Sequence, residues 1–419
     1  MTSRWPEYTL KEVCLCITDG AHKSPKSVDV GLPMASVKDL TPFGINIESC
    51  RKISEQDFKE LVRQNCQPKL DDVLIAKDGA TALDTVCEFK QNLDVVLLSS
   101  VAILRPDTKK IIPGFLRYYL DCNTTREYLK NGFITGAAIP RVVLEDFKRA
   151  KIKLPPLPTQ RKIAAILSAY DDLIENNTRR IKILEEMAQA LYREWFVHFR
   201  FPGHDKVQMV DSPLGRIPEG WEVKKVSDAI IINPKTKVPK QGMKPFITMD
   251  NLSTNSMIIE SYNYKDSNSG SKFKNGDTLF ARITPCLENG KTGFVQLLPD
   301  DVLAIGSTEF IVLRSKTLIP ELVYLIARSE AFREHAIKSM SGATGRQRVR
   351  ENCFDNFLIV QPEENILRQF HDIVSLIFEN VHILSCKNIS LRSIRDLLLP
   401  KLVSCEIDVS ELKLEEGAD

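Results

Sequence analysis

Two long stretches of the chain carry apolar residues at alternating steps of three and four, which is typical of a helix that buries one narrow stripe. The first begins after a proline-rich segment, with Thr159 as a suitable N-cap, and the second follows Pro362. Neither contains an interior Gly or Pro before Pro400, so each helix of about 36 residues spans roughly 50 Å. The first stripe comprises Ile163, Leu167, Tyr170, Ile174, Asn177, Ile181, Leu184, Ala188, Leu191 and Trp195. The second comprises Phe370, Ile373, Ile377, Leu384, Asn388, Leu391, Ile394 and Leu398.

A stripe this narrow on a helix this long is better covered by another helix than by a globular domain. The two helices can pair in either direction, and we favour an antiparallel coiled coil because it relates the halves of the chain by an approximate two-fold axis. Asn177 and Asn388 interrupt the stripes. A buried Asn can specify register at a cost in stability, although an exposed or otherwise satisfied Asn explains the same pattern.

The segments before the two helices repeat each other in order, at offsets that drift between 205 and 216 residues. The matched segments are 5–10 with 221–226, 33–40 with 245–252, 72–77 with 277–282, 101–105 with 310–314, 112–113 with 319–320, and Gly136 with Gly342. Each match alone is weak, but six in the same order indicate a duplicated domain. The predicted fold is therefore α/β (α+β), with two similar globular domains separated by two long helices.

Clusters of Pro and Gly mark the junctions between these parts. We predict a first domain over 1–155, a central helix over 156–200, a linker over 201–218, a second domain over 219–361, a C-terminal helix over 362–403 and an acidic tail over 404–419.

Composition narrows the class of protein. The chain has 419 residues, 43% of them hydrophobic, and a formal net charge of +2, so nucleic-acid binding would depend on local basic patches. The longest apolar stretch, 95–104, is too short to span a bilayer, and the first residues lack an apolar signal core. Ten scattered cysteines without a CxxC motif favour reduced thiols in the cytoplasm. The six histidines show no zinc-site spacing, so no metal is expected.

Candidate catalytic motifs are weak. The chain has no (Asp/Asn)-Pro-Pro-aromatic loop for adenine methylation, because its Pro-Pro pair lies between Leu154 and Leu157. Gly290-Lys291-Thr292 resembles the end of a P-loop but lacks the preceding glycine, which favours a hairpin turn. Asp72, Glu88 and Lys90 loosely match a Mg²⁺-dependent nuclease site, although the second copy has no counterpart of the Glu-x-Lys segment.

Several segments resemble the specificity subunit of type I restriction–modification enzymes. They are Leu154–Leu167, Leu191–His204, Pro218–Val223 and Leu397–Val403, and the similarity in order covers essentially the whole chain. The family usually has Gly where this chain has Cys405. The resemblance implies that the chain is a non-catalytic DNA-binding subunit with two target recognition domains, each of which reads one half of a bipartite double-stranded site.

The resemblance also implies the partners. The paired helices would set the spacer between half-sites, and would dock two methyltransferase subunits that carry S-adenosylmethionine and methylate adenine N6. Two restriction subunits, which use ATP and Mg²⁺, would complete the complex. The apolar segment Phe196–Phe201 either caps the helix stripe or meets a methyltransferase subunit. No cofactor is expected in this chain itself.

DNA contact is expected in basic, Gly-containing loops, because Lys, Arg and backbone N–H groups hold phosphates while Arg and short polar side chains read base edges. The strongest patch is 338–350, and its first-copy counterpart is 135–141. Lys77 and Arg282 share a repeat position and serve either as phosphate contacts or as salt-bridge partners. The candidate residues are His22, Lys23, Lys38, Lys77, Thr135, Arg141, Asn251, Arg282, Thr344, Arg346, Gln347 and Arg348.

Three functions compete at this point: a DNA-specificity subunit, an enzyme such as the Asp72 nuclease, and a coiled-coil scaffold without DNA function. The basic loops disfavour the scaffold, and the absence of complete catalytic motifs disfavours the enzyme. The sequence therefore favours the specificity subunit.

Overall fold

The computed structural model divides the chain into two compact units, each of which contains an α/β core and part of both long helices. Unit 1 comprises residues 1–175 and 390–419, and unit 2 comprises residues 176–389. The structure describes residues 5–136, 140–342, 345 and 347–412. In these ranges no helix is both long and apolar enough to cross a membrane.

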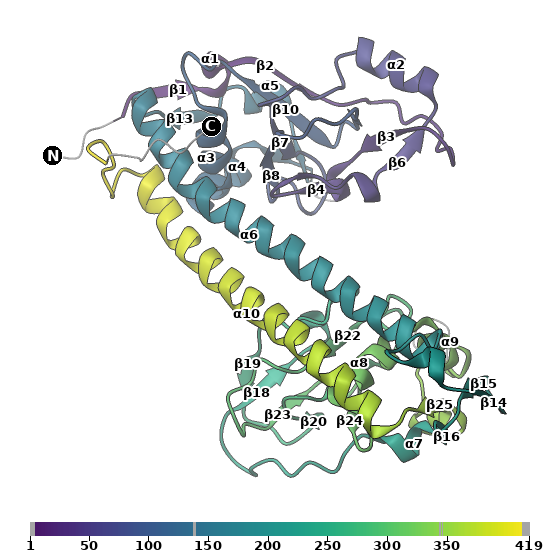
Figure 1. Ribbon diagram of the computed structural model, residues 1–419. Helices are drawn as coiled ribbons and strands as arrows, with labels where there is room; N and C mark the ends of the chain where they lie inside the picture. Colours follow the sequence, from purple (N-terminus) through teal and green to yellow (C-terminus); the bar gives the residue numbers. More distant parts are fainter. Residues whose placement is uncertain (1–4, 137–139, 343–344, 346, 413–419) are drawn as a thin grey trace. The chain divides into compact units, whose positions relative to one another are not determined.

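Unit 1 is built on a four-stranded antiparallel sheet in the order β2-β10-β7-β8 (Figure 1). Its two central strands, β7 and β10, are buried almost throughout, which explains why the sequence there reads as short continuous apolar runs. A smaller sheet has the order β6-β3-β9. The strands are β2 (Cys14–Asp19), β3 (Leu32–Ala35), β6 (Arg51–Ile53), β7 (Val73–Ala76), β8 (Val86–Glu88), β9 (Val96–Leu97) and β10 (Val101–Pro106).

Short helices and strand pairs complete unit 1. Helix α3 begins at Pro113, where the missing N–H costs nothing because the first turn has no acceptor for it. The helices are α1 (Leu10–Val13), α2 (Glu55–Arg63), α3 (Pro113–Asp121), α4 (Asn123–Phe133) and α5 (Leu144–Phe147). The strand pairs are β1 (Glu7–Thr9) with β13 (Lys151–Lys153), β4 (Leu40–Thr41) with β5 (Gly44–Ile45), and β11 (Ile134–Thr135) with β12 (Arg141–Val142).

Unit 2 repeats this plan, with a β17-β24-β21-β22 sheet and a second sheet in the order β19-β18-β23-β20. Helix α8 again begins at a proline, Pro320. The strands are β14 (Met209–Ser212), β15 (Gly215–Pro218), β16 (Glu222–Lys225), β17 (Ile230–Ile232), β18 (Lys244–Ile247), β19 (Asn263–Lys265), β20 (Ser271–Phe273), β21 (Thr278–Ala281), β22 (Thr292–Phe294), β23 (Ala304–Gly306), β24 (Phe310–Ser315) and β25 (Leu358–Gln361). The helices are α7 (Val226–Ala229), α8 (Pro320–Arg328) and α9 (Glu330–Lys338).

The internal repeat extends to single hydrogen bonds. Asp72 is buried and accepts two bonds from the Arg105 guanidinium, at 2.9 and 2.7 Å. Asp277 is equally buried and accepts two bonds from Arg314, at 2.7 and 2.6 Å. Each carboxylate also accepts a backbone N–H from three residues earlier in the chain. These matched pairs confirm the predicted duplication.

The two long helices are α6 (Leu157–Tyr192), which continues into a π-helical turn, η3 (Arg193–Val197), and α10 (Glu364–Val403). Helix α6 begins two residues before the predicted N-cap, Thr159, because Pro158 fits the first turn and Pro156 accepts the N–H of Gln160. After α10, Cys405 adopts a left-handed φ of 65°, the conformation for which glycine is favoured.

The helices pair antiparallel in each unit, as predicted. In unit 2, Asn177 bonds to Asn388, while Trp195, in the turn η3 that follows α6, contacts Phe370, earlier on α10. In unit 1, the beginning of α6 shares a core with the end of α10, including Leu399. Eleven predicted stripe residues are buried, namely Ile163, Leu167, Ile174, Asn177, Ile181, Ala188, Trp195, Phe370, Ile377, Leu384 and Asn388, and five are half-buried, namely Tyr170, Leu184, Leu191, Leu391 and Leu398.

Two predicted stripe residues of α10 are exposed instead. Ile373 and Ile394 are 42% and 44% exposed, whereas Val374 and Val381 are fully buried. At Ile373 the reason is that α10 packs against the core of unit 2 as well as against α6, so its buried face there is wider than a heptad stripe and includes the next residue, Val374.

An aromatic cluster in unit 2 includes the rings of the segment Phe196–Phe201, which fits the alternative that this segment caps the helix stripe. Phe196 packs edge-on against Phe370 with ring centroids 4.7 Å apart, and Phe201 stacks on Trp221 at 5.0 Å. The segment is apolar because it turns back onto its own core, although Val197 is half exposed.

The Asn177–Asn388 pair is buried, with the Asn177 amide donating to Asn388 Oδ1 at 3.0 Å and the Asn388 amide donating to Thr178 Oγ1 at 3.3 Å. We expect Asn177→Leu or Asn388→Leu alone to lower the free energy of unfolding by about 1–3 kcal/mol, because each removes the hydrogen bond between two buried amides and leaves the other amide beside an apolar side chain. The double Leu variant should recover most of this loss. Chemical denaturation measures all three, with Asn176→Leu at an exposed neighbour as the control. Equal destabilisation of the single and double variants would contradict the pairing.

Glu185 of α6 is also buried, and its Oε1 accepts the hydroxyl of Ser256 at 2.8 Å and the N–H of Met257 at 2.6 Å. Burial raises the pKa of Glu185 above its ordinary 4.5, and these two bonds only partly oppose the shift. The folded state therefore binds a proton before the unfolded state does, so this group adds stability as the pH falls from its raised pKa towards 4.5.

We expect Glu185→Gln, which keeps the acceptor oxygen, to remove that pH-dependent gain without weakening the fold at neutral pH. Thermal unfolding of the wild type, Glu185→Gln and the exposed control Glu186→Gln between pH 7 and 4.5 measures the difference. Parallel curves for the three proteins would show that Glu185 does not titrate in this range.

Candidate nucleic-acid interface

The predicted DNA-facing loop of unit 1 forms a hairpin between β11 and β12. Thr135 and Arg141 face each other across it, with the Thr135 hydroxyl 3.4 Å from the Arg141 carbonyl, and both are exposed. The Arg141 side chain is 63% exposed, and its Nε lies 3.3 Å from Asp78 Oδ1. Gly136 has a φ of 91° next to Thr135, and Gly342 in the second copy has a φ of 127°. The hairpin is therefore held at its base while its arginine reaches solvent.

The equivalent loop of unit 2 is anchored in the same way. Val142 donates its N–H to the Lys77 carbonyl in unit 1, and Val349 donates its N–H to the Arg282 carbonyl in unit 2. Gln347 is half-buried, and its backbone exchanges hydrogen bonds with Thr284 at 3.1 Å. The predicted residues Thr344 and Arg346 lie outside the described residues.

Arg348 occupies the position that Arg141 occupies in unit 1, and it too has an acidic partner. Its guanidinium donates to the Glu309 carboxylate at 2.8–3.0 Å, and the side chain is 46% exposed. Exposed ion pairs contribute little net stability, so the acid orients each arginine without fixing it strongly in place. The sequence showed the arginines but not the acids that orient them.

Lys77 and Arg282 lie at the base of the two loops. Lys77 is buried, with its Nζ 2.8 Å from Asp19 Oδ2, so it fits the salt-bridge alternative rather than a phosphate contact. Arg282 is half-buried, and its Nε donates to the Val349 carbonyl at 3.0 Å. Both residues fix the base of a loop.

Three further candidates, His22, Lys23 and Lys38, lie near Lys77 in unit 1. His22 Nε2 lies 3.2 Å from Asp19, which also holds Lys77, and Lys23 follows it at the surface. Lys38 is exposed on a short turn, η1 (Val37–Asp39), whose first N–H bonds to Ser100, while the carbonyl of Ser100 accepts the N–H of Lys77. The fold thus brings His22, Lys38, Lys77 and Arg141 to one end of the unit 1 sheet.

Asn251 is a different case. Its Oδ1 accepts both the N–H and the hydroxyl of Thr248 at 2.8 Å, which forms a capping box on the turn η5 (Met249–Asn251). Asp39 does the same for Ser36 in unit 1. The side chain of Asn251 therefore has a local structural role, which the Thr-x-x-Asn spacing could have indicated.

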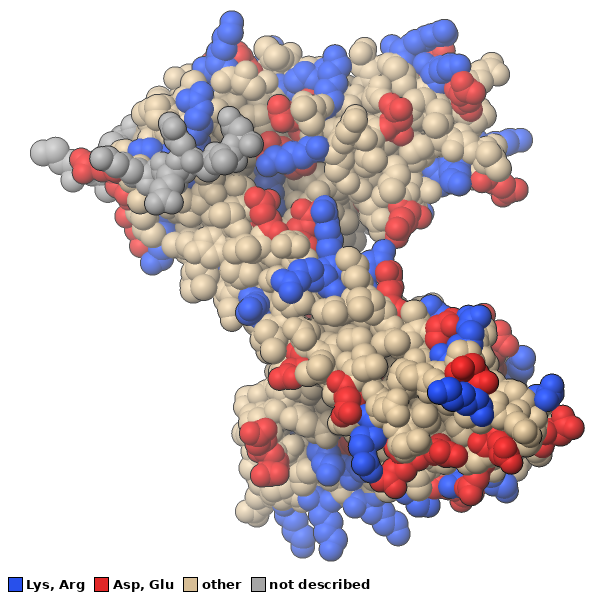
Figure 2. Space-filling model, in the orientation of Figure 1, with Lys and Arg blue, Asp and Glu red and all other residues tan. Residues whose placement is uncertain are grey.

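Unit 2 contains a further basic segment, which was not among the predicted contact residues. The stretch between β17 and β18 contains no acidic residue, and Lys235, Lys237 and Lys240 are exposed along it. Figure 2 shows Lys and Arg side chains gathered along the edge of unit 2 that holds β18 to β20.

The alternative catalytic motifs have structural explanations. Both carboxylate oxygens of Asp72 accept hydrogen bonds from Arg105, and the Glu88 carboxylate pairs with the Lys90 ammonium at 3.2 Å. Gly290, Lys291 and Thr292 form the turn into β22, and the Lys291 ammonium donates to the Met249 carbonyl. Among the described residues, no group of three or more His, Cys, Asp or Glu side chains could hold a metal ion. None of the ten cysteines, all within the described ranges, is disulfide-bonded.

Known proteins share both the sequence and the fold. Residues 2–186 and 218–385 match the family described as "Type I restriction modification DNA specificity domain". The MjaIX specificity subunit of Methanocaldococcus jannaschii is 27% identical over 313 residues, which covers 72% of this chain and 71% of that protein. The HindI specificity subunit of Haemophilus influenzae is 24% identical over 388 residues and covers 74% of this chain and 81% of that protein.

A solved structure is similar in fold. The crystal structure of the S subunit of the type I restriction–modification system of M. genitalium superposes with a TM-score of 0.57 at 14% identity, over 95% of this chain and 96% of that one. The duplicated domain, the two long helices and the two family matches agree with one another. The chain belongs to the family of type I restriction–modification DNA specificity subunits.

Proposed function

We propose that the chain is the DNA-reading subunit of a type I restriction–modification complex, in which the globular part of each unit reads one half of a bipartite double-stranded site. The observation that carries the proposal is the duplicated core with matched anchors, such as Asp72–Arg105 and Asp277–Arg314, beneath loops that share little sequence. A shared framework with different loops suits the reading of two different half-sites.

We further propose that the helix pair acts as the spacer. Helix α6 runs through 36 residues into both units, which corresponds to roughly 54 Å at 1.5 Å per residue. One to one-and-a-half turns of duplex have a similar length, about 34–50 Å. A continuous helix would therefore convert residue number into the unread distance between half-sites.

The outer faces of the long helices are the proposed docking surface for methyltransferase subunits. Several large apolar side chains remain 39–68% exposed there, more than a helix pair needs for its own packing. They are Leu173, Ile183, Met187, Ile373, Leu376, Ile383, Ile389, Ile394 and Leu397. In this proposal the methyltransferase subunits supply S-adenosylmethionine and transfer the methyl group to adenine N6, restriction subunits supply ATP- and Mg²⁺-dependent cleavage, and this chain contributes recognition without catalysis.

Methylation mapping tests the proposal directly. The chain, co-expressed with its methyltransferase subunit, should copurify with it and direct N6-methyladenine to a motif of two short specified blocks separated by unspecified bases. Genome-wide methylation mapping reads the motif, and the methyltransferase subunit expressed alone is the control. A contiguous motif, or no methylation beyond the control, would contradict the bipartite reading.

The loop arginines provide a second test. Removal of a phosphate contact should lower the slope of log K against log salt by about one unit. We expect this for Arg141→Gln, Arg348→Gln and Arg350→Gln, which are exposed in the two DNA-facing loops. Fluorescence anisotropy with the bipartite duplex at several salt concentrations measures the slope, and Lys109→Gln removes an exposed charge elsewhere in unit 1 as the control. If the arginine variants keep the slope of the control, these loops do not hold phosphates.

A further inference from the structure

The two copies differ at the joint between each globular core and the long helices. Tyr324 follows Pro320 in α8 at the same interval as Arg117 follows Pro113 in α3, so the two occupy equivalent positions. The strand registers likewise make Glu88 equivalent to Phe294, because each lies opposite the first residue of the neighbouring central strand. The contact between the globular core and the long helices is therefore ionic in unit 1, and the equivalent contact in unit 2 is aromatic.

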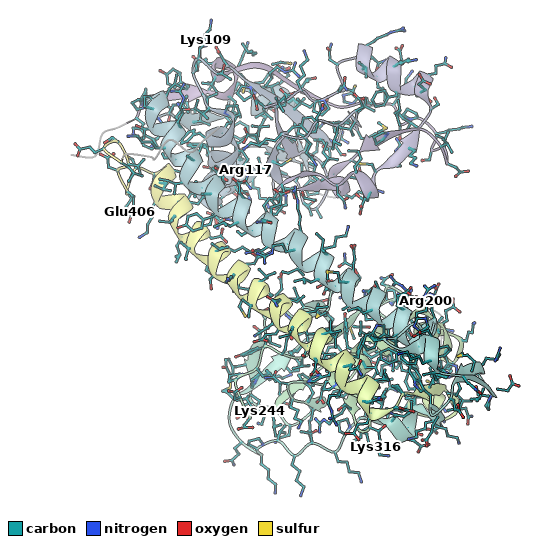
Figure 3. The ribbon with its side chains drawn as sticks, in the orientation of Figure 1. Lys109, Arg117, Arg200, Lys244, Lys316 and Glu406 are labelled. Atoms are coloured by element: carbon teal, nitrogen blue, oxygen red, sulfur yellow. The ribbon has the colours of Figure 1, made fainter. Side chains whose placement is uncertain are left out.

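In unit 1 the joint is built around Asp171 of α6. Its Oδ2 accepts from Arg117 Nη1 at 2.5 Å and from the Tyr118 hydroxyl at 2.8 Å, and its Oδ1 accepts from Arg395 Nη1 of α10 at 2.5 Å. The side chains of Asp171 and Arg117 are 8% and 4% exposed. Figure 3 shows Arg117 on α3, beside α6. One carboxylate thus ties the globular core to both long helices.

The carboxylate of Asp171 remains charged at this joint. Burial favours a raised pKa for Asp171, but Arg117 and Arg395 outweigh it and hold the pKa below the ordinary value. Glu88, whose own pKa is raised by burial, lies close enough to Arg117 to be influenced by its charge. The Arg117 guanidinium also packs over the Tyr118 ring at 4.2 Å from its centroid.

In unit 2 the equivalent joint is a trio of aromatic rings. Phe294 of β22 lies edge-on to Phe378 of α10 with ring centroids 5.0 Å apart, and Tyr324 lies edge-on to Phe378 at 5.7 Å. Tyr324 and Phe378 are each 2% exposed. Phe378 takes the place of Asp171, since each faces the equivalent residue of α8 or α3.

The two chemistries constrain geometry differently. Charge-assisted hydrogen bonds to a planar guanidinium are satisfied over a narrow range of distance and angle, and breaking one leaves a buried charge. A shift between aromatic rings loses part of their dispersion energy but leaves no buried charge without a partner. Displacement of α3 on α6 and α10 in unit 1 is therefore penalised more steeply than displacement of the rings in unit 2.

We propose that Asp171 is a positioning residue for DNA recognition: together with Arg117, Tyr118 and Arg395 it fixes the angle at which the first recognition domain is presented to its half-site. This inference rests on the proposed function, because the half-site is the one that unit 1 reads. Asp171 does not contact DNA in this scheme. It determines how well the first half-site is recognised when the spacer length is wrong.

The test is a transplant of the unit 2 chemistry into unit 1. The variant Glu88→Phe, Arg117→Tyr, Asp171→Phe and Arg395→Ala replaces the ionic joint by an apolar one and leaves no charge buried without a partner. Arg395→Gln is a milder variant that keeps the Arg117–Asp171 pair and whose site is partly exposed, and it keeps the test valid if the transplant does not fold. Tyr324→Phe preserves the ring joint of unit 2 and is the matched control.

Each variant is assembled with the methyltransferase subunit and given duplexes whose spacer is one base pair shorter, correct or one base pair longer. We expect the ratio of methylation on wrong to correct spacers to rise about tenfold for the transplant and less for Arg395→Gln, because one charge-assisted bond corresponds to about that factor. The control should keep the wild-type ratio, and melting curves should show that the variants are folded.

Unchanged spacer selectivity in folded variants would overturn the proposal, and so would an equal change in Tyr324→Phe. A loss of methylation in proportion on all three spacers would also overturn it, because it would indicate loss of structure rather than of positioning. These outcomes are distinct from failure of the proposed function, in which the wild-type complex itself would methylate no bipartite motif.

Discussion

The antiparallel register of α6 and α10 is the constraint on which each unit depends. In unit 1 the core includes Ile163 of α6 and Leu399 of α10, and in unit 2 the rings of Trp195 and Phe370 meet inside the core. Each globular core is therefore built on both helices at once. A slip of one turn between the helices would separate Asn177 from Asn388 and remove apolar partners from both cores, so the register and the two folds stabilise one another.

Much of this arrangement could be predicted from the sequence because it depends on periodicity, which is a local property. The stripes indicated the long helices and the order of repeated segments indicated the duplication. The error at Ile373 has a physical source, since a heptad stripe describes a helix with one neighbour. Helix α10 has two neighbours in unit 2, so Val374 and Val381 are also buried, and only the tertiary structure shows which faces are covered.

The candidate site was predicted less well, because the role of a charged residue depends on partners that are distant in sequence. Lys77 and Arg141 look alike as basic residues near turns, yet one is buried against Asp19 and the other is exposed beside Asp78. The sequence separation between Lys77 and Asp19 hides their pairing. The capping role of Asn251 is different, since its partner Thr248 is three residues away and the spacing alone carries the signal.

The contrast between Arg117–Asp171 and Tyr324–Phe378 shows that duplication constrains the backbone more strongly than the chemistry of its contacts. Both joints fill the same space between an α-helix of the core and the long helices, but they do so with interactions that cannot be mixed. An aromatic ring in place of Arg117 would remove one of the two cations that pair with the buried carboxylate of Asp171, and an arginine in place of Tyr324 would bury a charge against the ring of Phe378. The residues of each joint must therefore change together, although they lie on segments far apart in sequence. A recognition domain exchanged at a boundary near residue 155 would separate Arg117 from Asp171, so the compatibility of two such proteins depends on the joint as well as on the recognition loops.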